Sequence, residues 1–476
     1  MKSSKNKVVI AGASGYIGQN LLKKLKNKTN LVGLSRNKRK DTKEVEWRSC
    51  DLFSLADAED ALKDADIAVY LVHSMIPSAK LTQASFEDMD VILADNFARA
   101  AKRQNVKEII YLSGIIPDND QHLSRHLSSR LEVENILRHY GTPVTAIRAG
   151  LVVGPNGSSF PILAKLVQRL PAMILPRWTS SKTQPVALDD VLNSLSKVIL
   201  NTVNKNRSID IGGPDVMTYR SMMEETARIL EKKRYMFNVP LFSLSLSKLW
   251  LRLITQTPKE IVYPLVESLT HEMIVQDSKY VKGISDGKIP FREAAKIAIE
   301  LDKNNFKAKK KRVLSPLIQD VRSIQRIPLP TGQDADWVGR YYTAWLENFL
   351  NPWIKTETDN KLNCKIGFLN KKLLMLELSY SNERSTPDRA LYYINDGILT
   401  DKRKNKRGRM EFRKIPGKNE AIIAIHDYTP SLPWFIYYLT QANAHLFVMK
   451  AFKNHIKKIN DGKIPVPDSC TAFQTQ

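Results

Sequence analysis

Three glycines near the start of the chain have the spacing of an anion-binding turn. Gly12, Gly15 and Gly18 follow the apolar residues 8–11 and overlap the start of a segment with helical spacing, residues 16–26. The first glycine allows a tight turn, the second lets backbone N–H groups approach a pyrophosphate, and the third lets the helix pack on the strand. The N-terminal end of the helix adds a positive dipole. We therefore expect a dinucleotide to bind here, although the same glycines would also suit a turn needed only for packing.

The residues after the second apolar run distinguish between two dinucleotides. An acidic residue after this strand, residues 31–34, would bond a ribose 2′-hydroxyl and favour NAD. The chain instead carries Arg36, flanked by Ser35 and Lys38, and an arginine can pair with a 2′-phosphate. This favours NADP over NAD, unless Arg36 is only a surface residue. Residues 50–52 end a further expected strand, which comes third in the chain. Asp51 in this segment is placed to bond the adenine amino group.

The elements around these residues alternate between strands and helices. Short apolar runs separated by helical patterns predict parallel strands joined by right-handed crossovers, and hence a doubly wound α/β sheet. The expected strands are residues 8–11, 31–34, 67–72, 109–113, 144–148 and 208–214, and the expected later helices are residues 218–236 and 290–302. Residues 239–254 predict an amphipathic helix that is buried, forms a lid, or lies at a membrane or partner surface.

Further motifs resemble the short-chain dehydrogenase/reductase superfamily, in its extended and atypical branches. They are residues 12–18, 50–52, 111–114, 148–155, 185–191, and 211–214 with Thr218 and Tyr219. The resemblance implies a Rossmann domain with a small substrate lobe over residues 1–302, and NADP or NAD as the cofactor. Together with the glycine turn it gives these cofactor contacts: Gly12, Ser14, Gly15, Tyr16, Ile17, Gly18, Ser35, Arg36, Asp51, Leu52, Leu71, Val72, His73, Ser113 and Arg130.

The positions that carry catalysis in this superfamily are altered. Ser113 matches the family serine, but the pair Tyr-x-x-x-Lys, in which the lysine lowers the tyrosine pKa, is missing after it. The best superposition puts His126 and Arg130 in its place. His126 can exchange a proton near neutral pH or be a surface histidine, whereas Arg130 is too basic for acid-base chemistry and would hold a ribose or phosphate. His73 would pack against the nicotinamide ribose or be a plain loop residue.

Loss of the tyrosine is a mark of the atypical branch, which holds isoflavone-reductase-like enzymes, NmrA-type redox sensors and the NADPH-binding accessory subunit of respiratory complex I. Two functions therefore stay open. One is an NAD(P)-dependent oxidoreductase acting on a hydrophobic small molecule, with Ser113 polarising a carbonyl and His126 donating a proton. The other is a non-catalytic NADPH sensor or assembly factor that binds a quinone-like ligand or a respiratory protein complex.

The pattern of the sequence changes from helical to strand-like after the basic run at residues 307–312. We therefore expect a basic linker at 303–320 and a second domain at 321–476. Expected strands at residues 366–369, 373–380, 391–394, 407–413 and 420–426, closed by one long helix at 433–459, predict an α+β domain. Motifs such as residues 321–330 and 426–430 resemble a bacterial group in which a dinucleotide-binding domain is fused to a C-terminal domain. That C-terminal domain resembles START-like, helix-grip folds, which wrap a long helix in a curved sheet. The side chains that either line a cavity or form plain core are Trp434, Phe435, Tyr437, Tyr438, Leu446, Phe447, Met449 and Phe452.

The charge leaves several partners open. The chain carries a net charge of +24, which suits acidic nucleotides and anionic membranes but also simple solubility. The basic stretch 402–409 predicts an exposed hairpin that can touch anionic lipid, whereas no nucleic-acid module is recognisable. We expect no metal site, because the three cysteines are scattered and no further ligand is recognisable beside His426, Asp427 and His445. With no long apolar run, we expect a cytoplasmic protein that is either free or peripheral at the inner face of the membrane.

Overall fold

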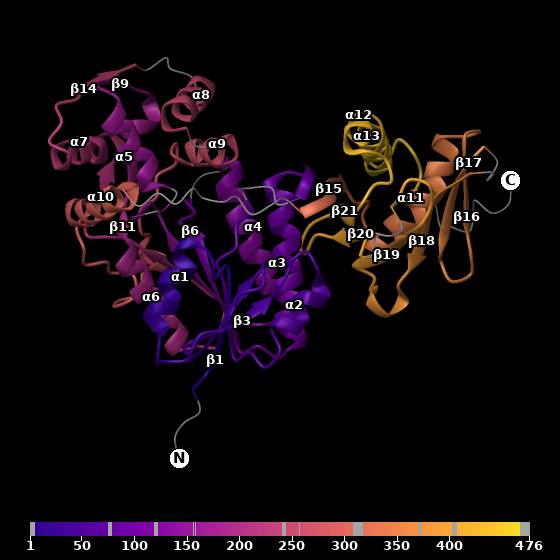
Figure 1. The fold of residues 1–476 in the computed structure, drawn as a ribbon, viewed down its shortest axis with the longest axis horizontal. Coiled ribbons are helices and arrows are strands. Elements are labelled where there is room, and N and C mark those ends of the chain that lie inside the picture. Colours follow the sequence, from indigo (N-terminus) through magenta and orange to yellow (C-terminus); the bar gives the residue numbers. More distant parts are fainter. Residues whose placement is uncertain are drawn as a thin grey trace. The chain divides into compact units, whose positions relative to one another are not determined.

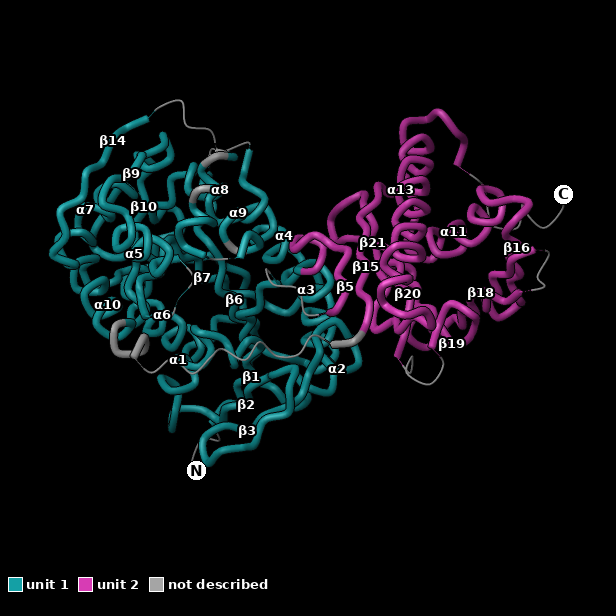
Figure 2. The backbone as a smooth tube through the Cα atoms, turned by 45° about the horizontal axis from the view of Figure 1, so that its top comes forward, with its two compact units in different colours: residues 1–76, 90–313 teal, residues 77–89, 314–476 magenta. Residues whose placement is uncertain are grey.

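The computed structural model describes residues 5–74, 79–118, 122–155, 157, 159–239, 244–256, 258–307, 318–369, 373–401 and 407–466. The chain forms two compact units (Figure 2), and the first contains residues 1–76 and 90–313. The second contains residues 77–89 and 314–476. The middle of the predicted basic linker, residues 308–317, lies outside the described residues, as do residues 402–406 of the predicted basic hairpin.

The first unit is built on seven parallel strands in the order β12-β7-β6-β4-β1-β2-β3. The strands are β1 (Lys7–Ala11), β2 (Asn30–Ser35), β3 (Val45–Ser49), β4 (Ile67–Tyr70), β6 (Glu108–Gly114), β7 (Val144–Ala149) and β12 (Arg207–Ile211). The order reverses between β1 and β4, so the segments that follow these two strands diverge and leave a crevice at their carboxyl ends. The predicted doubly wound Rossmann-type sheet is confirmed.

Helices cover both faces of this sheet (Figure 1). They are α1 (Tyr16–Leu25), α2 (Leu55–Ala61), α3 (Phe86–Arg103), α4 (Arg125–His139) and α6 (Leu188–Leu200). Buried residues of α1 and α6 pack in one core with Val8 and Ile10 of β1 and Ile147 of β7. Because alternate residues of a strand point to one face, this core lies on a single side of the sheet, and α3 and α4 lie on the other.

In the described residues, five helices, α5 and α7–α10, form a small lobe from segments that come after β7. The helices are α5 (Phe160–Arg169), α7 (Tyr219–Ile229), α8 (Leu244–Thr255), α9 (Lys259–Ser268) and α10 (Phe291–Lys307), and the short strands are β8 (Val152–Val153), β9 (Ala172–Leu175), β10 (Lys182–Thr183), β11 (Val186–Ala187), β13 (Met217–Thr218) and β14 (Tyr235–Asn238). Single 3₁₀ turns occur at Arg177–Ser180 and Asp277–Lys279. The prediction of one helix over 218–236 is wrong at its end, because Glu231 adopts φ +55° and the chain turns into β14.

The second unit holds an antiparallel sheet in the order β16-β17-β18-β19-β20-β21-β15, to which β5 adds in parallel at the β15 edge. The strands are β5 (Ala79–Gln83), β15 (Ile318–Pro328), β16 (Ile354–Thr358), β17 (Cys364–Phe368), β18 (Leu373–Tyr380), β19 (Arg389–Asp396), β20 (Arg409–Lys414) and β21 (Glu420–Tyr428), and a 3₁₀ turn spans Asn382–Arg384. The sequence analysis placed β5 in the first domain. Its apolar residues are too few to show which sheet it joins.

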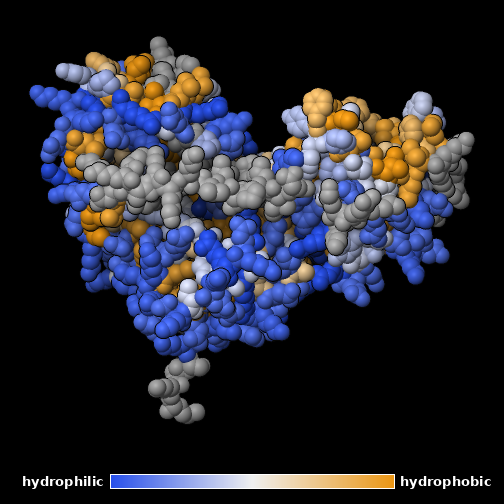
Figure 3. All heavy atoms as spheres, in the orientation of Figure 1, coloured by the Kyte–Doolittle hydropathy of each residue, from blue (hydrophilic) through white to orange (hydrophobic). Residues whose placement is uncertain are grey.

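Three helices complete the second unit: α11 (Ala335–Phe349), α12 (Trp434–Leu439) and α13 (Gln441–Asn460). The prediction of one long helix over 433–459 is wrong, because Thr440 adopts φ −113° and ψ −83° and divides it in two. Figure 3 shows apolar side chains gathered over α12, where Phe435, Tyr438 and Leu439 are exposed. By contrast, Phe452 of α13 is fully buried between Tyr342 and Trp345, with ring centroids 5.1 and 4.9 Å away.

We expect Phe452→Ala to destabilise the second unit by about 3–5 kcal/mol, because it leaves a cavity among packed aromatic rings. The matched control is Phe435→Ala, which removes the same atoms from a side chain that is 77 % exposed and should cost less than about 1 kcal/mol. Denaturant unfolding monitored by tryptophan fluorescence measures both. Equal losses for the two variants would contradict the assigned core.

Candidate functional site

The glycine turn after β1 has no room for larger residues. Gly12 adopts φ +83°, and a Cβ there would lie 3.0 Å from the carbonyl carbon and oxygen of Leu71, which follows β4. The Leu71 N–H donates to the Ala11 carbonyl over 3.0 Å, so the ends of β1 and β4 stay in contact. A Cβ on Gly18 would lie 2.3 Å from the Gly12 oxygen. The turn is therefore held close to the sheet edge, at the crevice.

The N-terminus of α1 is suited to an anion. Gly15 is its N-cap residue and has no side chain to cap the helix, and no acidic residue lies in the first turn. Backbone N–H groups at such an end are available to phosphate oxygens. The Tyr16 phenol lies against Gly154 and Gly157, so Tyr16 offers its backbone rather than its side chain to a ligand. These residues fit a dinucleotide diphosphate.

The predicted adenosine contacts lie at the ends of β2 and β3. Ser35 is buried at the end of β2, and Arg36 directly after it is exposed. Asp51 follows β3, and one of its carboxylate oxygens accepts a hydrogen bond from the Phe53 N–H over 3.1 Å. Asp51 therefore stabilises its own turn. Arg36 leaves its guanidinium in solvent, where a 2′-phosphate can reach it.

Ser113 and Arg130 lie near the end of β6. Ser113 is buried and pairs in register with Arg148 of β7. The Tyr111 hydroxyl donates to the Arg130 carbonyl over 3.3 Å and accepts from the Arg130 guanidinium over 3.4 Å, so Tyr111 holds Arg130 in place. Burial raises the pKa of Tyr111, and Arg130 opposes this shift only in part. Tyr111 therefore does not replace the missing acidic tyrosine.

A carboxylate that the sequence analysis missed lies beside His73. Asp90 of α3 is 1 % exposed, and its Oδ2 lies 2.7 Å from Nδ1 of His73. Its Oδ1 accepts the Ser74 N–H over 2.8 Å, and Ser129 of α4 donates to Oδ2 over 3.3 Å. The available signal was a single aspartate between Met89 and Val91 on a helix that is otherwise buried there.

His126 of α4 lies next to this pair. Its ring centroid is 5.0 Å from that of His73, and the planes are tilted by 58°. Burial lowers the pKa of His126 well below its ordinary value, and the nearby positive charges of His73 and Arg130 lower it further. His126 is therefore a neutral imidazole at neutral pH. The structure thus brings His73, His126 and Arg130 together around one region of the sheet edge.

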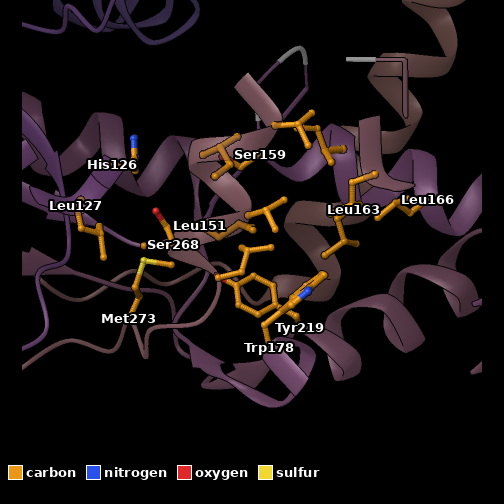
Figure 4. A pocket seen from close by; sticks show the side chains of 18 of the residues that line it. His126, Leu127, Leu151, Ser159, Leu163, Leu166, Trp178, Tyr219, Ser268 and Met273 are labelled. Carbon is orange, nitrogen blue, oxygen red and sulfur yellow. The ribbon is translucent and has the colours of Figure 1, made fainter. Parts of the chain in front are cut away.

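A pocket of about 130 Å³ extends from this edge into the small lobe. Figure 4 shows His126 near one end, with Trp178 and Tyr219 deeper inside. Gly114 and Leu127 line the end close to Ser113. The other lining residues are mostly aliphatic, and none is Asp, Glu, Lys or Arg: Ala149, Gly150, Leu151, Ser159, Ile162, Leu163, Leu166, Met223, Leu251, Val262, Leu265, Val266, Ser268, Leu269 and Met273. The pocket suits an uncharged, apolar molecule.

The second unit has its own cavity, of about 280 Å³. Its walls are apolar except for a few groups, including Ser323, Gln441 and His445, and the last lies 3.1 Å from the Ser323 hydroxyl. Burial lowers the pKa of His445 to about 4, so this imidazole is neutral at pH 7. Of the predicted aromatic and methionine stripe, Tyr437 lines the cavity, whereas Phe435, Tyr438 and Phe447 face solvent. The prediction that these three line a cavity or form core is wrong, because Phe435 and Tyr438 lie on α12, which the break at Thr440 separates from α13, and Phe447 lies on the exposed face of α13.

The residues that the structure describes include neither a metal-binding cluster nor a helix that could span a membrane. They contain no cluster of three histidine, cysteine, aspartate or glutamate side chains arranged to hold a metal ion. Within the same residues, no helix combines the length and the apolarity that crossing a bilayer requires.

Comparison with known proteins agrees with the site in the first unit. Residues 12–164 match a protein family described as NAD(P)H-binding. The auxiliary protein GraX of Staphylococcus aureus is 38 % identical over 143 residues, which cover 29 % of this chain and 43 % of GraX. The mitochondrial 40 kDa subunit of NADH-ubiquinone oxidoreductase from Neurospora crassa is 22 % identical over 240 residues, covering 48 % and 62 % of the two chains. The alignments thus span about half the length of these relatives.

Among solved structures, the NADPH-dependent quinone oxidoreductase QOR2 from Escherichia coli superposes with a TM-score of 0.47 at 18 % identity, over 60 % of this chain and 98 % of that chain. The first unit of the protein is an NAD(P)-binding Rossmann domain. The predicted cofactor, NADP or NAD, is confirmed at this level. The choice between the two dinucleotides stays a prediction.

We expect Gly12→Ala to weaken dinucleotide binding at least tenfold, because its Cβ would push the turn away from Leu71. Gly141→Ala is the matched control, since Gly141 has nearly the same φ of +82° but follows α4, with only the far end of Lys102 near its Cβ. Both variants should lose thermal stability through backbone strain. Calorimetry with NADPH separates them, and equal binding by Gly12→Ala and the unmodified protein would contradict the site.

Proposed function

We propose that the protein is an NADP-dependent reductase that acts on a small, uncharged, apolar carbonyl compound held in the pocket of the first unit. The observation that supports this most is the position of the pocket. Its end is lined by His126 and by Gly114, which directly follows Ser113 at the carboxyl end of β6. A substrate in this pocket would therefore lie beside the nicotinamide end of a bound dinucleotide.

The side chains at this end have distinct roles in the proposed reaction. When bound, the reduced nicotinamide supplies a hydride to the carbonyl carbon. The Ser113 hydroxyl donates a hydrogen bond to the carbonyl oxygen and orients it. His126 donates the proton that this oxygen gains, so that an alcohol forms. Arg130, held by Tyr111, binds the ribose or a phosphate and keeps the cofactor in register.

NADP is preferred over NAD in this proposal because of the residues after β2. Arg36 is exposed directly after Ser35, and neither residue is acidic. A guanidinium pairs with the two charges of a 2′-phosphate, whereas a carboxylate at this place would repel them. The proposed preference thus depends on Arg36.

For the second unit we propose a START-like, helix-grip domain that holds a hydrophobic ligand. Two features support the proposal: the order strand, helix, six antiparallel strands and C-terminal helix, and the apolar cavity lined by residues of the sheet, α11 and α13. Attachment to an anionic membrane surface, a respiratory protein partner and a cytoplasmic location stay predictions.

We expect Arg36→Ala to raise the dissociation constant for NADP about tenfold or more while leaving that for NAD unchanged, since one charge-assisted pair with the 2′-phosphate is lost. Arg39→Ala is the control, because Arg39 carries the same charge but stacks on Trp47, 4.8 Å from the ring centroid. Calorimetric titrations of both variants with both dinucleotides provide the comparison. A parallel loss for NADP and NAD would count against the assigned role of Arg36.

Turnover is tested with NADPH and a panel of apolar ketones, aldehydes and quinones, by following the absorbance of the reduced nicotinamide. We expect consumption above background that falls about 100-fold in His126→Gln and at least tenfold in Ser113→Ala. His139→Gln, at an exposed histidine of the same helix α4, should keep full activity. Tight NADPH binding with no turnover of any compound would overturn the reductase and favour a sensor or assembly factor.

A further inference from the structure

We infer that Asp90, His73 and His126 form a coupled proton relay, in which His73 resupplies the proton that His126 gives to the substrate and Asp90 positions His73. This inference rests on the proposed reductase for its role in turnover. The relay would take the place of the tyrosine and lysine that this chain lacks. Asp90 is not among the residues that the sequence pattern singled out.

His126 alone is a poor proton source. It lines the substrate pocket, but burial and two positive neighbours lower its pKa, so that it carries a single proton at neutral pH. Loss of that proton to a substrate would leave an imidazolate, which is far too basic to form. His126 can therefore act as a donor only if its other nitrogen receives a proton in the same step. Its Nδ1 is buried and has no hydrogen-bond partner, so it is available for this.

His73 is placed to supply that proton. Its ring lies 5.0 Å from the ring of His126, measured between centroids, and since Nδ1 of His126 makes no hydrogen bond, the relay passes the proton between the rings through one water molecule. The His73 side chain is 14 % exposed but its Nε2 is buried, so in the relay proton uptake from solvent requires a water molecule to reach this atom. His73 thus connects the solvent to a histidine that faces the pocket.

Asp90 fixes this arrangement. Its Oδ2 lies 2.7 Å from Nδ1 of His73, while the Ser74 N–H and the Ser129 hydroxyl hold the carboxylate in place. A buried carboxylate at this distance stabilises positive charge on His73 and leaves its Nε2 as the nitrogen that exchanges protons. Asp90 does not touch the pocket and acts through His73. It is a positioning residue.

The other titratable groups around the relay do not compete for the proton. Tyr70 and Tyr111 lie beside it, and burial raises the pKa of both phenols. Arg130 is a permanent cation. Its charge lowers the pKa of His126 and so opposes storage of a second proton there. These groups therefore do not compete with the two histidines for the proton.

The proton balance of the reaction follows from this order. The carbonyl carbon gains a hydride from the reduced nicotinamide, and the carbonyl oxygen takes a proton from His126. His126 regains one from protonated His73, and His73 regains one from solvent. The sum is one ketone, one NADPH and one proton consumed, with one alcohol and one NADP⁺ formed. The positive charge on His73 is needed at the start of the step, so turnover should fall as pH rises and His73 loses its proton.

The first test measures coupling without any substrate. The full-length protein, prepared with carbon-labelled histidine, is titrated by NMR, and its 8 histidines are assigned by single substitutions. We expect His73→Gln to raise the midpoint of His126, since a positive neighbour is removed. We expect Asp90→Asn to lower the midpoint of His73 by about one pH unit or more. Unchanged midpoints in both variants would overturn the relay, whatever the protein catalyses.

The second test uses turnover of the NADPH-loaded protein with a compound that the panel identifies. Asp90→Asn should lower the rate about 10–100-fold and shift the alkaline limb of the pH profile to lower pH, with the NADPH affinity unchanged. Asp60→Asn, at an exposed aspartate of α2, is the control for loss of a carboxylate. A thermal melt checks that Asp90→Asn is folded.

The outcomes separate the two proposals. An unshifted pH profile in folded Asp90→Asn would overturn the relay and leave the reductase intact. Coupled midpoints with no turnover of any compound would overturn the reductase and leave the coupling of the three side chains established.

Discussion

The contact between the ends of β1 and β4 is the constraint on which the first unit depends. The Leu71 N–H bonds to the Ala11 carbonyl, and the Leu71 carbonyl lies where a side chain on Gly12 would be. The turn is therefore forced close to the sheet, and the N-terminus of α1 lies over the crevice with its backbone N–H groups uncapped by side chains. The same contact sets the start of the segment that carries His73. The contact between these two backbone segments thus positions both the turn that suits a diphosphate and the start of the proposed proton relay.

Burial and charge decide which side chains near this crevice can do chemistry. Tyr111 has the right side chain for proton transfer, but it is enclosed within the sheet, and its hydroxyl is occupied by Arg130. His126 has the right position, but burial and its neighbours keep it neutral. Asp90 adds a buried negative charge beside His73. In the proposed site, proton transfer therefore depends on several side chains together and not on a single acidic residue.

The parts of this structure that were predictable from the sequence have local causes. The glycine turn, the parallel strands and the adjacent Ser35 and Arg36 follow from spacing within a few residues. Asp90 was not predictable in this way, because its partner His73 is distant along the chain and a lone aspartate on a helix usually faces solvent. The break at Thr440 was missed since no glycine or proline marks it, and the apolar pattern continues through it.

The pairing of β5 with β15 joins two segments that are far apart along the chain, as Ala79 aligns with Ile318. During synthesis on the ribosome, β5 emerges long before its partner strand exists. Its open edge must wait while the rest of the first unit is made, and open edges invite pairing with other chains. If the gene were cut near residue 314, the C-terminal fragment would lack its edge strand β5. The N-terminal fragment would contain β5 without its partner strand β15. The two units should therefore be expressed together, as a single polypeptide.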